Sequence, residues 1–483
     1  MSQVDLTSIL PELILAGGGV LLLLLEAFVP ALRRAFTGLA LLATAAAGWA
    51  AVAWVAEGPS WNGLLEATPF TRALSLVVLL ATVLGLLASQ GYLRREGILT
   101  GEYHALLLWC ATGLLLMLRA TELLTVFLSL ELLSLCLYPL AAFHRRLQVG
   151  TEAAIKYFLM GAFVSAFVLY GIALVYGATG TTRFSGIGEA FAARGSTPVV
   201  ASLGLLLLVA GFGFKMSVVP FHAWAPDTYQ GAPSPFVAFL SVAPKAASAM
   251  VLYRVLEAAT VGTGGPHGLA GVHWSRVVAL LSVLSMLAGN LLALAQTDIK
   301  RMLAYSGIAH MGYLLLALVV VDRPSLPPVI LYLLAYVLMN AGAFAVVTML
   351  YARPGEKHLI SDLSGWGYRY PVLGGCLAVC MLSLAGIPPT LGFFGKYLVF
   401  LNAVGDGLVG LAVVGVLASL VGVFYYLRVV YVLYMKAEVR EPAGLLIDGW
   451  GRAAALLAAL GTLAFGLWPT RLLEWLLQAS PLR

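Results

Sequence analysis

Residues 201–221 read ASLGLLLLVAGFGFKMSVVPF. An apolar run of about 20 residues is long enough to cross the hydrocarbon core of a membrane as an α-helix. This run holds one charged residue, Lys215, and meets Pro220 soon after it. Proline removes a hydrogen bond inside a helix, and its ring clashes with the preceding turn. The stretch therefore predicts a membrane helix that is broken close to a buried charge.

The composition of the whole chain predicts an all-α integral membrane protein. Of its 483 residues, 61% are hydrophobic and only 10% are charged, whereas soluble domains carry about 25% charged residues. Near-continuous apolar runs favour helices over the alternating strands of a membrane barrel. We predict about fourteen membrane helices, at 8–30, 36–56, 71–91, 103–118, 121–143, 151–176, 198–219, 232–258, 276–296, 301–321, 327–351, 371–400, 408–436 and 453–478.

Two of the predicted helices are broken, and their places suggest a repeat. The seventh meets Pro220, and the twelfth contains Gly386-Ile387-Pro388-Pro389. Each is the fourth member of a block of five, if helices 4–8 form one block and helices 9–13 the other. An odd number of helices inverts the second block, which is typical of transporter folds. We expect four regions: residues 1–100, the repeats at 101–260 and 270–440, and a C-terminal helix at 441–483.

The distribution of basic residues predicts how the chain lies in the membrane. The odd-numbered connections carry most of the Lys and Arg residues, for example Arg145 and Arg146. Positive charge favours the cytoplasmic side. The chain is therefore expected to be a multi-pass protein of the bacterial inner (plasma) membrane with both termini in the periplasm. No basic stripe with interleaved aromatic residues indicates nucleic-acid binding.

Two more lysines and one glutamate lie in apolar runs. Lys245 follows Pro244 in FVAFLSVAPKAASAMVLY, and Lys396 lies in LSLAGIPPTLGFFGKYLVF. A charge at the centre of a membrane helix costs about 2.5–3.5 kcal/mol and usually marks an ion or proton path. Glu131, in the fifth helix, could pair with a lysine and keep it charged. The alternatives are a structural ion pair for Glu131 and snorkelling to the membrane surface for the lysines.

Three further residues are candidates with open roles. His310 lies in the tenth helix, and its pKa suits proton transfer, but it could equally be a packing residue. His222 and Asp227 flank the break in PFHAWAPD and could either gate access or satisfy the backbone near the prolines. Asp298, Lys300 and Arg301 lie in a predicted cytoplasmic turn and are interpreted as topology anchors.

The four cysteines do not indicate a metal or redox centre. Cys110, Cys136, Cys376 and Cys380 all lie in apolar runs, and none forms a C-x-x-C pair. We interpret them as packing residues. No dinucleotide-binding fingerprint is found either.

The residues around these charges resemble a known family, the antiporter-like membrane subunits of complex I. The resemblance covers nearly the whole chain. The segments that carry it are ELLSLCLYPLAAF, AAIKYFLMGAFVSAFVLYGIALVYGATGT, GFGFKMSVVPFHAWAPDTYQGAPSPFVAFLSVAPKAA, QTDIKRMLAYSGIAHMGY and LSLAGIPPTLGFFGKYLVF. The resemblance implies a fold of fourteen helices with inverted repeats of five.

The resemblance also implies roles for individual residues. Glu131 would pair with Lys215, Lys245 would be the central relay position, and Lys396 would lie towards the exit. His310 would lie along the same chain of polar groups and water. Lys396 argues against the M-type subunit of the family, which typically has glutamate there.

The function implied is proton translocation in the membrane arm of NADH:quinone oxidoreductase, driven by redox chemistry in partner subunits. No cofactor is expected on this chain; NADH, FMN, iron–sulfur clusters and quinone would be bound by partner subunits. The expected partners are the neighbouring subunit M, the small subunits K and J, and the lipid bilayer. The alternative is a subunit of a multi-subunit cation/proton antiporter, because its core helices look similar.

Overall fold

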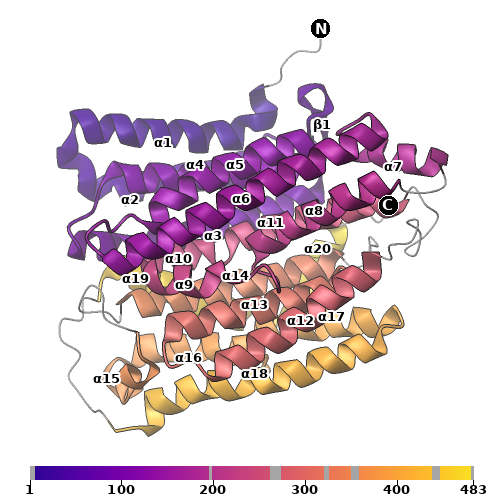
Figure 1. The fold of residues 1–483 in the computed structure, drawn as a ribbon. Helices are drawn as coiled ribbons and strands as arrows, with labels where there is room; N and C mark the ends of the chain where they lie inside the picture. The colour runs from indigo at the N-terminus through magenta and orange to yellow at the C-terminus, as the bar shows by residue number, and fades with distance from the viewer. Residues whose placement is uncertain are drawn as a thin grey trace.

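The computed structural model describes residues 6–194, 198–261, 274–319, 326–349, 358–437 and 447–479, and these residues are almost entirely helical. The long helices run side by side in one elongated bundle (Figure 1). The helices are α1 (Leu10–Phe28), α2 (Phe36–Ala53), α3 (Pro69–Arg95), α4 (Gly101–Arg119), α5 (Leu123–Ala141), α6 (Gln148–Thr179), α7 (Phe184–Arg194), α8 (Val199–Met216), α9 (Trp224–Gly231), α10 (Ser234–Leu240), α11 (Ala243–Val261), α12 (Trp274–Leu294), α13 (Ile299–Ala317), α14 (Leu326–Met349), α15 (Trp366–Arg369), α16 (Pro371–Ala385), α17 (Leu391–Gly405), α18 (Val409–Met435), α19 (Gly449–Leu467) and α20 (Pro469–Ala479).

The predicted all-α membrane class is confirmed. Within the described residues, twelve helices are long and apolar enough to cross a membrane. Two shorter apolar helices, α16 and α17, follow one another in the chain, and α13 is long but carries Lys300, Arg301 and His310. Every predicted membrane segment contains one of these helices. The total of fourteen crossings stays a prediction.

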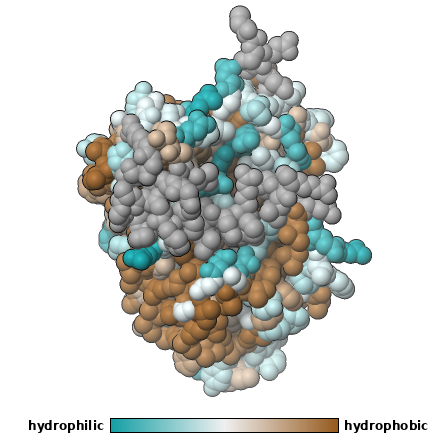
Figure 2. All heavy atoms as spheres, turned by 90° about the vertical axis from the view of Figure 1, so that its right-hand side faces the viewer, coloured by the Kyte–Doolittle hydropathy of each residue, from teal (hydrophilic) through white to brown (hydrophobic). Residues whose placement is uncertain are grey.

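Burial separates central helices from peripheral ones. In the most apolar 18-residue stretch of each span, all residues of the α10–α11 span and 94% of those of α14 are buried, whereas only 28% of those of α6 are. The exposed side chains of the peripheral helices are large and apolar, for example Phe163 and Leu420. Figure 2 views the bundle from the right-hand side of Figure 1: hydrophobic residues cover the lower flank, and hydrophilic residues gather higher up. Apolar surface on the flanks suits a lipid environment.

Both predicted breaks are present. Helix α8 ends at Met216, and Ser217 takes a left-handed conformation with φ 61°; α9 begins only at Trp224. Helix α16 ends at Ala385, and Gly386 has φ 83° before α17 begins. In both places a left-handed residue ends the helix, as is common at helix C-termini.

The predicted eighth helix differs from expectation, because it is divided into α10 and α11. Ser241 and Val242 separate the two parts. Pro244 lies in the first turn of α11, where its missing N–H breaks no helical hydrogen bond. In the middle of a continuous helix from α10 to α11, the same proline would remove a hydrogen bond and clash with the preceding turn. The predicted loop at 177–197 also differs, since residues 184–194 form α7; residues 195–197 lie outside the described part of the chain.

Two short backbone bridges have the same pattern in the two predicted blocks. At the start of α5, the N–H of Leu123 donates to Thr182 O, and the N–H of Phe184 donates to Thr121 O. At the start of α13, the N–H of Ile299 donates to His358 O, and the N–H of Ile360 donates to Thr297 O. The second helix of each predicted block is thus tied in the same way to a later connection of its own block.

Two arginines make a second matched contact. Arg254 on α11 donates to Leu118 O and Ala120 O at the end of α4, and Arg428 on α18 donates to Leu294 O and Gln296 O at the end of α12. Each arginine satisfies carbonyls that a helix end leaves without a partner. In both blocks the fifth helix thereby caps the first. These contacts support the repeat of five helices, which stays a prediction.

The chain returns at its end to the N-terminal region. Helix α19 packs against α3, α14 and α16. The small hairpin of β1 (Gly58–Ser60) and β2 (Leu65–Ala67), between α2 and α3, closes the opposite side of that region (Figure 1). Helix α3 therefore contacts both the hairpin and α19.

Candidate functional site

The three lysines that stand out in the sequence are all buried. Lys215 is 3% exposed, Lys245 is 0% exposed and Lys396 is 6% exposed. None of them therefore reaches the surface of the chain by snorkelling. Buried amines need either polar partners or a change of protonation state.

Lys215 lies in the last turn of α8 and does not form the expected direct ion pair with Glu131. Its Nζ donates to Ser134 Oγ at 2.8 Å, while Glu131 Oε1 accepts from Ser165 Oγ at 2.6 Å. No ion pair between Glu131 and Lys215 is formed in the described residues. Ser134 lies three residues after Glu131 and so shares its face of α5. Lys215 and Glu131 therefore have different serine partners, Ser134 and Ser165.

Aromatic rings surround the Lys215 ammonium. Nζ lies 5.6 Å from the ring centroid of Tyr138 and 5.7 Å from that of Tyr157. A cation over an aromatic face is attracted by the ring quadrupole. Neither tyrosine was identified from the sequence, because their proximity depends on how α5, α6 and α8 pack.

Lys245, at the start of α11, has no hydrogen-bond partner among the described residues. The ring of Tyr229 on α9 has its centroid 5.6 Å from Nζ. A Cβ added to Gly307 of α13 would lie 3.0 Å from this Nζ and 2.8 Å from the hydroxyl of Tyr336. The amine therefore occupies a space that the missing side chain of Gly307 leaves open.

His310 lies in the same buried region as Lys245. Its Nδ1 is 2.6 Å from the Tyr332 hydroxyl, and its Nε2 is 3.1 Å from the Tyr426 hydroxyl. The hydroxyls of Ser306 and Tyr426 are also hydrogen-bonded to each other. The histidine is thus the centre of a hydrogen-bonded cluster that joins α13, α14 and α18.

Lys396, on α17, is held at the second helix break. Its Nζ donates to Leu384 O at 2.9 Å, to Ala385 O at 3.2 Å and to Ser419 Oγ at 2.9 Å. The two carbonyls belong to the last turn of α16, which has no further helical donors. The ring of Tyr313 lies 5.2 Å from the ammonium. The break thus supplies the polar partners that make this burial possible.

Tyrosine and asparagine side chains continue from Tyr313. Asn290 Nδ2 donates to the Tyr313 hydroxyl at 2.8 Å, and the Tyr425 hydroxyl donates to Asn290 Oδ1 at 3.0 Å. The ring of Tyr313 also lies 5.7 Å from the ring of His310. The environments of His310 and Lys396 are therefore contiguous.

The two predicted gate residues do not join the lysines. Asp227 lies at the end of the molecule where α9 meets α13, and its carboxylate accepts from Arg301 at 2.7 Å and from Lys156 at 3.3 Å. Burial raises the pKa of the Asp227 carboxyl, but the hydrogen bonds from Arg301 and Lys156 outweigh it and hold the pKa below its usual range. His222 is half-buried, and its Nδ1 has no partner among the described residues.

The turn before α13 is more than a topology anchor. Asp298 caps α13 by accepting from the N–H groups of Lys300 and Arg301, and Lys300 Nζ donates to Ala232 O at 2.7 Å. Arg301 also donates to Gln230. The turn therefore holds the C-terminal end of α9 and the chain that follows it.

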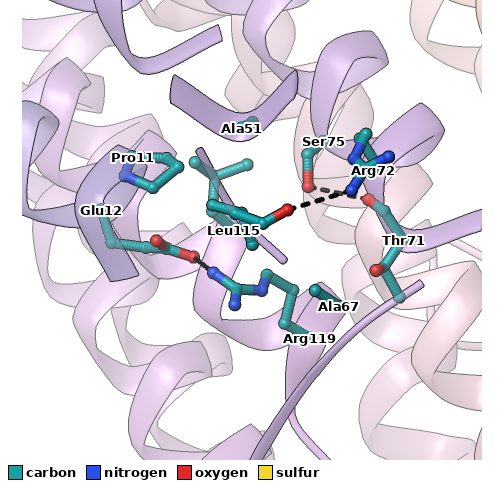
Figure 3. A pocket seen from close by; sticks show the side chains of 10 residues that line it. Pro11, Glu12, Ala51, Ala67, Thr71, Arg72, Ser75, Leu115 and Arg119 are labelled. Atoms are coloured by element: carbon teal, nitrogen blue, oxygen red, sulfur yellow. Dashed lines mark hydrogen bonds and ion pairs between the residues drawn. The ribbon is translucent and has the colours of Figure 1, made fainter. Parts of the chain in front are cut away.

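A separate pocket lies among α1, α2, α3 and α4, away from the lysines. Figure 3 shows its central feature, the ion pair between Glu12 and Arg119, with a nitrogen–oxygen distance of 2.7 Å. None of the predicted site residues lines this pocket. The ion pair joins α1 to α4, and so attaches the N-terminal helices to the first predicted block.

The described residues contain no group of three or more His, Cys, Asp or Glu side chains that could hold a metal ion. The four cysteines are buried and not disulfide-bonded. The arrangement can bind and release protons on buried amines and an imidazole.

Comparison with known proteins assigns this arrangement to a family. Residues 120–422 match the family model described as NADH:quinone oxidoreductase/Mrp antiporter, TM. A protein of Trichlorobacter lovleyi named NADH-quinone oxidoreductase subunit N is 39% identical over 482 residues, covering 99% of this chain and 98% of that protein. The protein of the same name from Myxococcus xanthus is 40% identical, over 99% of this chain and 98% of its own length.

Solved structures of the same fold support this family assignment. A chain of respiratory complex I from Thermus thermophilus with bound aureothin matches with a TM-score of 0.80 and 35% identity, over 96% of this chain and 98% of that chain. A chain of the Mrp complex from Dietzia has a TM-score of 0.82 but only 22% identity, over 99% and 97% of the two chains. The second match shows a shared fold alone.

Proposed function

The chain belongs to the NADH:quinone oxidoreductase/Mrp antiporter transmembrane family, and we propose that it moves protons through its buried lysines as a subunit of NADH:quinone oxidoreductase. The resemblance noted in the sequence is thereby confirmed. Relatives of about 40% identity over the full length carry the oxidoreductase name. The Mrp antiporter shares the fold at 22% identity and is the less supported alternative.

The observation that carries the proposal is the contiguity of three buried titratable side chains, Lys245, His310 and Lys396. Lys245 Nζ faces the space over Gly307 beside Tyr336, and the ring of Tyr336 is 5.3 Å from the ring of His310. From His310 the contacts continue through Tyr313 to Lys396. Lys215 is a fourth buried amine, on α8, and it donates to Ser134.

Each group has a role in this proposal. Lys215 changes in this proposal between its contact with Ser134 and a pair with Glu131, and this change alters how tightly the amine holds its proton. Lys245 and His310 pass the proton through the centre, and Lys396 releases it towards the exit. Moving one charge through 100 mV requires about 2.3 kcal/mol, and a change of one pKa unit supplies about 1.4 kcal/mol. Modest rearrangements of the partners are therefore sufficient.

The energy for these rearrangements comes from partner subunits in this proposal. We propose that NADH, FMN, iron–sulfur clusters and quinone are bound there and not on this chain. The neighbours proposed are subunit M and the small subunits K and J.

We place the chain in the bacterial inner membrane with both termini in the periplasm, as the basic connections indicate. The four regions divided near residues 100, 260 and 440 also stay a proposal.

Replacing Lys215 by alanine tests the function. We expect Lys215→Ala to assemble into the complex but to reduce NADH-driven proton pumping by about tenfold or more, which corresponds to about 1.4 kcal/mol. Pumping is measured in membrane vesicles and divided by the rate of NADH oxidation. Lys436→Ala is the matched control, because Lys436 is exposed at the end of α18. Normal pumping by an assembled Lys215→Ala complex would identify the chain as a scaffold instead.

A further inference from the structure

Helix α9 lies between the environments of Lys215 and Lys245 and contacts the surroundings of both. Seven residues separate it from the end of α8, and it ends just before α10. It packs against α6 on one side and α13 on the other. Because breaks in the chain flank it at both ends, it is an element separate from α8 and α10.

The first end of α9 contacts the Lys215 environment through Trp224. The indole ring stacks on Tyr157 with a centroid distance of 4.6 Å and an interplanar angle of 25°. Its Nε1 donates to Phe214 O at 2.8 Å, next to Lys215 in the chain. Tyr157 is one of the two rings that face the Lys215 ammonium.

The other end of α9 contacts Lys245 through Tyr229. The Tyr229 ring is fully buried and lies 5.6 Å from Lys245 Nζ, which has no hydrogen-bond partner in the described part of the chain. The rings of Trp224 and Tyr229 are 6.3 Å apart, edge to face. An aromatic series of Tyr157, Trp224 and Tyr229 therefore runs from one lysine to the other.

The polar side of α9 is attached to both neighbours. Asp227 pairs with Arg301 of α13 at 2.7 Å and with Lys156 of α6 at 3.3 Å. Asp227 therefore ties α9 to both α13 and α6, while the two aromatic residues of α9 contact the surroundings of both lysines.

We propose that α9 is the element that couples Lys215 to Lys245, and that the ring of Tyr229 is a positioning residue that holds the Lys245 ammonium by a cation–π contact. This inference rests on the proposed function. An aromatic face attracts a cation but cannot take its proton. The ring therefore holds the charged amine in place and leaves the proton free to pass to another group. A shift of α9 changes this contact and the Tyr157 contact together.

The experiment compares one substitution that keeps the aromatic ring at position 229 with one that removes it. Tyr229→Phe keeps the aromatic face, and Tyr229→Leu removes it. In membranes containing the full complex, we expect Tyr229→Leu to lower the ratio of proton pumping to NADH oxidation by about tenfold, and Tyr229→Phe to stay within about twofold of the unchanged protein. Tyr103→Leu is the control for loss of a buried ring, because Tyr103 is also fully buried and pairs with Ser89.

A graded series separates a cation–π contact from packing. Phenylalanines with one, two and three ring fluorines at position 229 have nearly the same shape but progressively weaker attraction for a cation. We expect pumping to fall with each added fluorine. If the complex with Tyr229→Leu fails to assemble, the fluorinated series by itself tests whether the ring holds Lys245 by a cation–π contact.

The inference is overturned if Tyr229→Leu pumps normally, if Tyr229→Phe and Tyr229→Leu are equally impaired, or if fluorination has no effect. Lys245→Ala is measured in parallel. Normal pumping by Lys245→Ala would refute the proposed function itself, whereas impaired pumping by Lys245→Ala with normal pumping by Tyr229→Leu would refute only the role of the ring.

Discussion

Single side chains decide how the buried amines are accommodated. Lys215 uses a serine hydroxyl, Lys396 uses the carbonyls of a helix end, and Lys245 uses the space over a glycine. Each solution avoids a permanent ion pair with a carboxylate. A strong fixed pair would stabilise one protonation state and oppose proton transfer. The burial of these lysines is therefore compatible with exchange of their protons.

Gly307→Ala is expected to impair proton pumping. The added methyl group would lie 3.0 Å from Lys245 Nζ and 2.8 Å from the Tyr336 hydroxyl, so one of the two side chains must move. Inserting a methyl group into a packed core costs about 1–3 kcal/mol, and we expect pumping per NADH oxidised to fall about fivefold. Gly375→Ala on α16 is the control, because nothing lies within 4 Å of its added Cβ. Equal pumping by the two variants would contradict the role given to this space.

The sequence identified the buried charges but not their immediate partners. An apolar run around Lys215, Lys245 or Lys396 is visible along the chain, so the cost of burying each charge can be predicted. Nothing in the sequence of their own helices distinguishes Ser134, Tyr229 and Tyr313 from other polar or aromatic residues. Their importance follows only from the helices against which they pack.

Short and broken helices position these residues. The breaks after α8 and α16 were predicted from Pro220 and from Pro388-Pro389, because proline cannot continue a helix. The division between α10 and α11 was not predicted, although Pro244 was the available signal. The helix ends created by these breaks lie inside the molecule and provide polar backbone groups there.

Asp227 is expected to stabilise the position of α9 at all physiological pH values. Its pKa lies below the usual range because of Arg301 and Lys156, so its contribution is present above about pH 3.9 and is lost only as the pH falls through the lowered value. For partly exposed pairs the gain is about 0.2–1 kcal/mol. Asp227→Asn should therefore accelerate hydrogen exchange of the α9 amides about 1.4- to 5-fold, equally at pH 6 and pH 8.

Hydrogen exchange followed by mass spectrometry on the assembled complex checks this prediction. Glu152→Gln is the control, since Glu152 pairs with the exposed Lys156 on α6 and not with α9 within the described residues. The exchange rates are first corrected for intrinsic exchange. If the effect of Asp227→Asn then differs between pH 6 and pH 8, the carboxylate titrates in this range, and the prediction of a lowered pKa is wrong.

At the scale of the whole molecule, Lys245 belongs to the most buried group of helices. The most buried helices, α10–α11 and α14, lie between two groups of helices with lipid-like surfaces. The matched contacts of Arg254 and Arg428 lie at the ends of α4 and α12, the first helices of the two predicted blocks. If the blocks are inverted, these ends lie on opposite sides of the membrane.

Cysteine labelling tests this arrangement. Asn62, in the hairpin between α2 and α3, is expected to face the periplasm, and Arg146, between α5 and α6, the cytoplasm; both are exposed. A membrane-impermeant maleimide should label Asn62→Cys in cells with a permeabilised outer membrane and Arg146→Cys only in inverted vesicles. The four native cysteines are buried and should give little background. The reverse pattern would invert the proposed topology.

The sequence alone determined the membrane class, the two predicted helix breaks and the three buried amines. These properties depend on hydrophobicity, proline and charge within one stretch of chain, and the energetic cost of each can be estimated without knowing its neighbours. The tertiary structure alone decided that Lys215 meets Ser134 and not Glu131, that Lys245 lies over Gly307 beside Tyr229, and that α9 connects the two. These contacts join residues on different helices, and packing between helices depends on the shape of both surfaces at once.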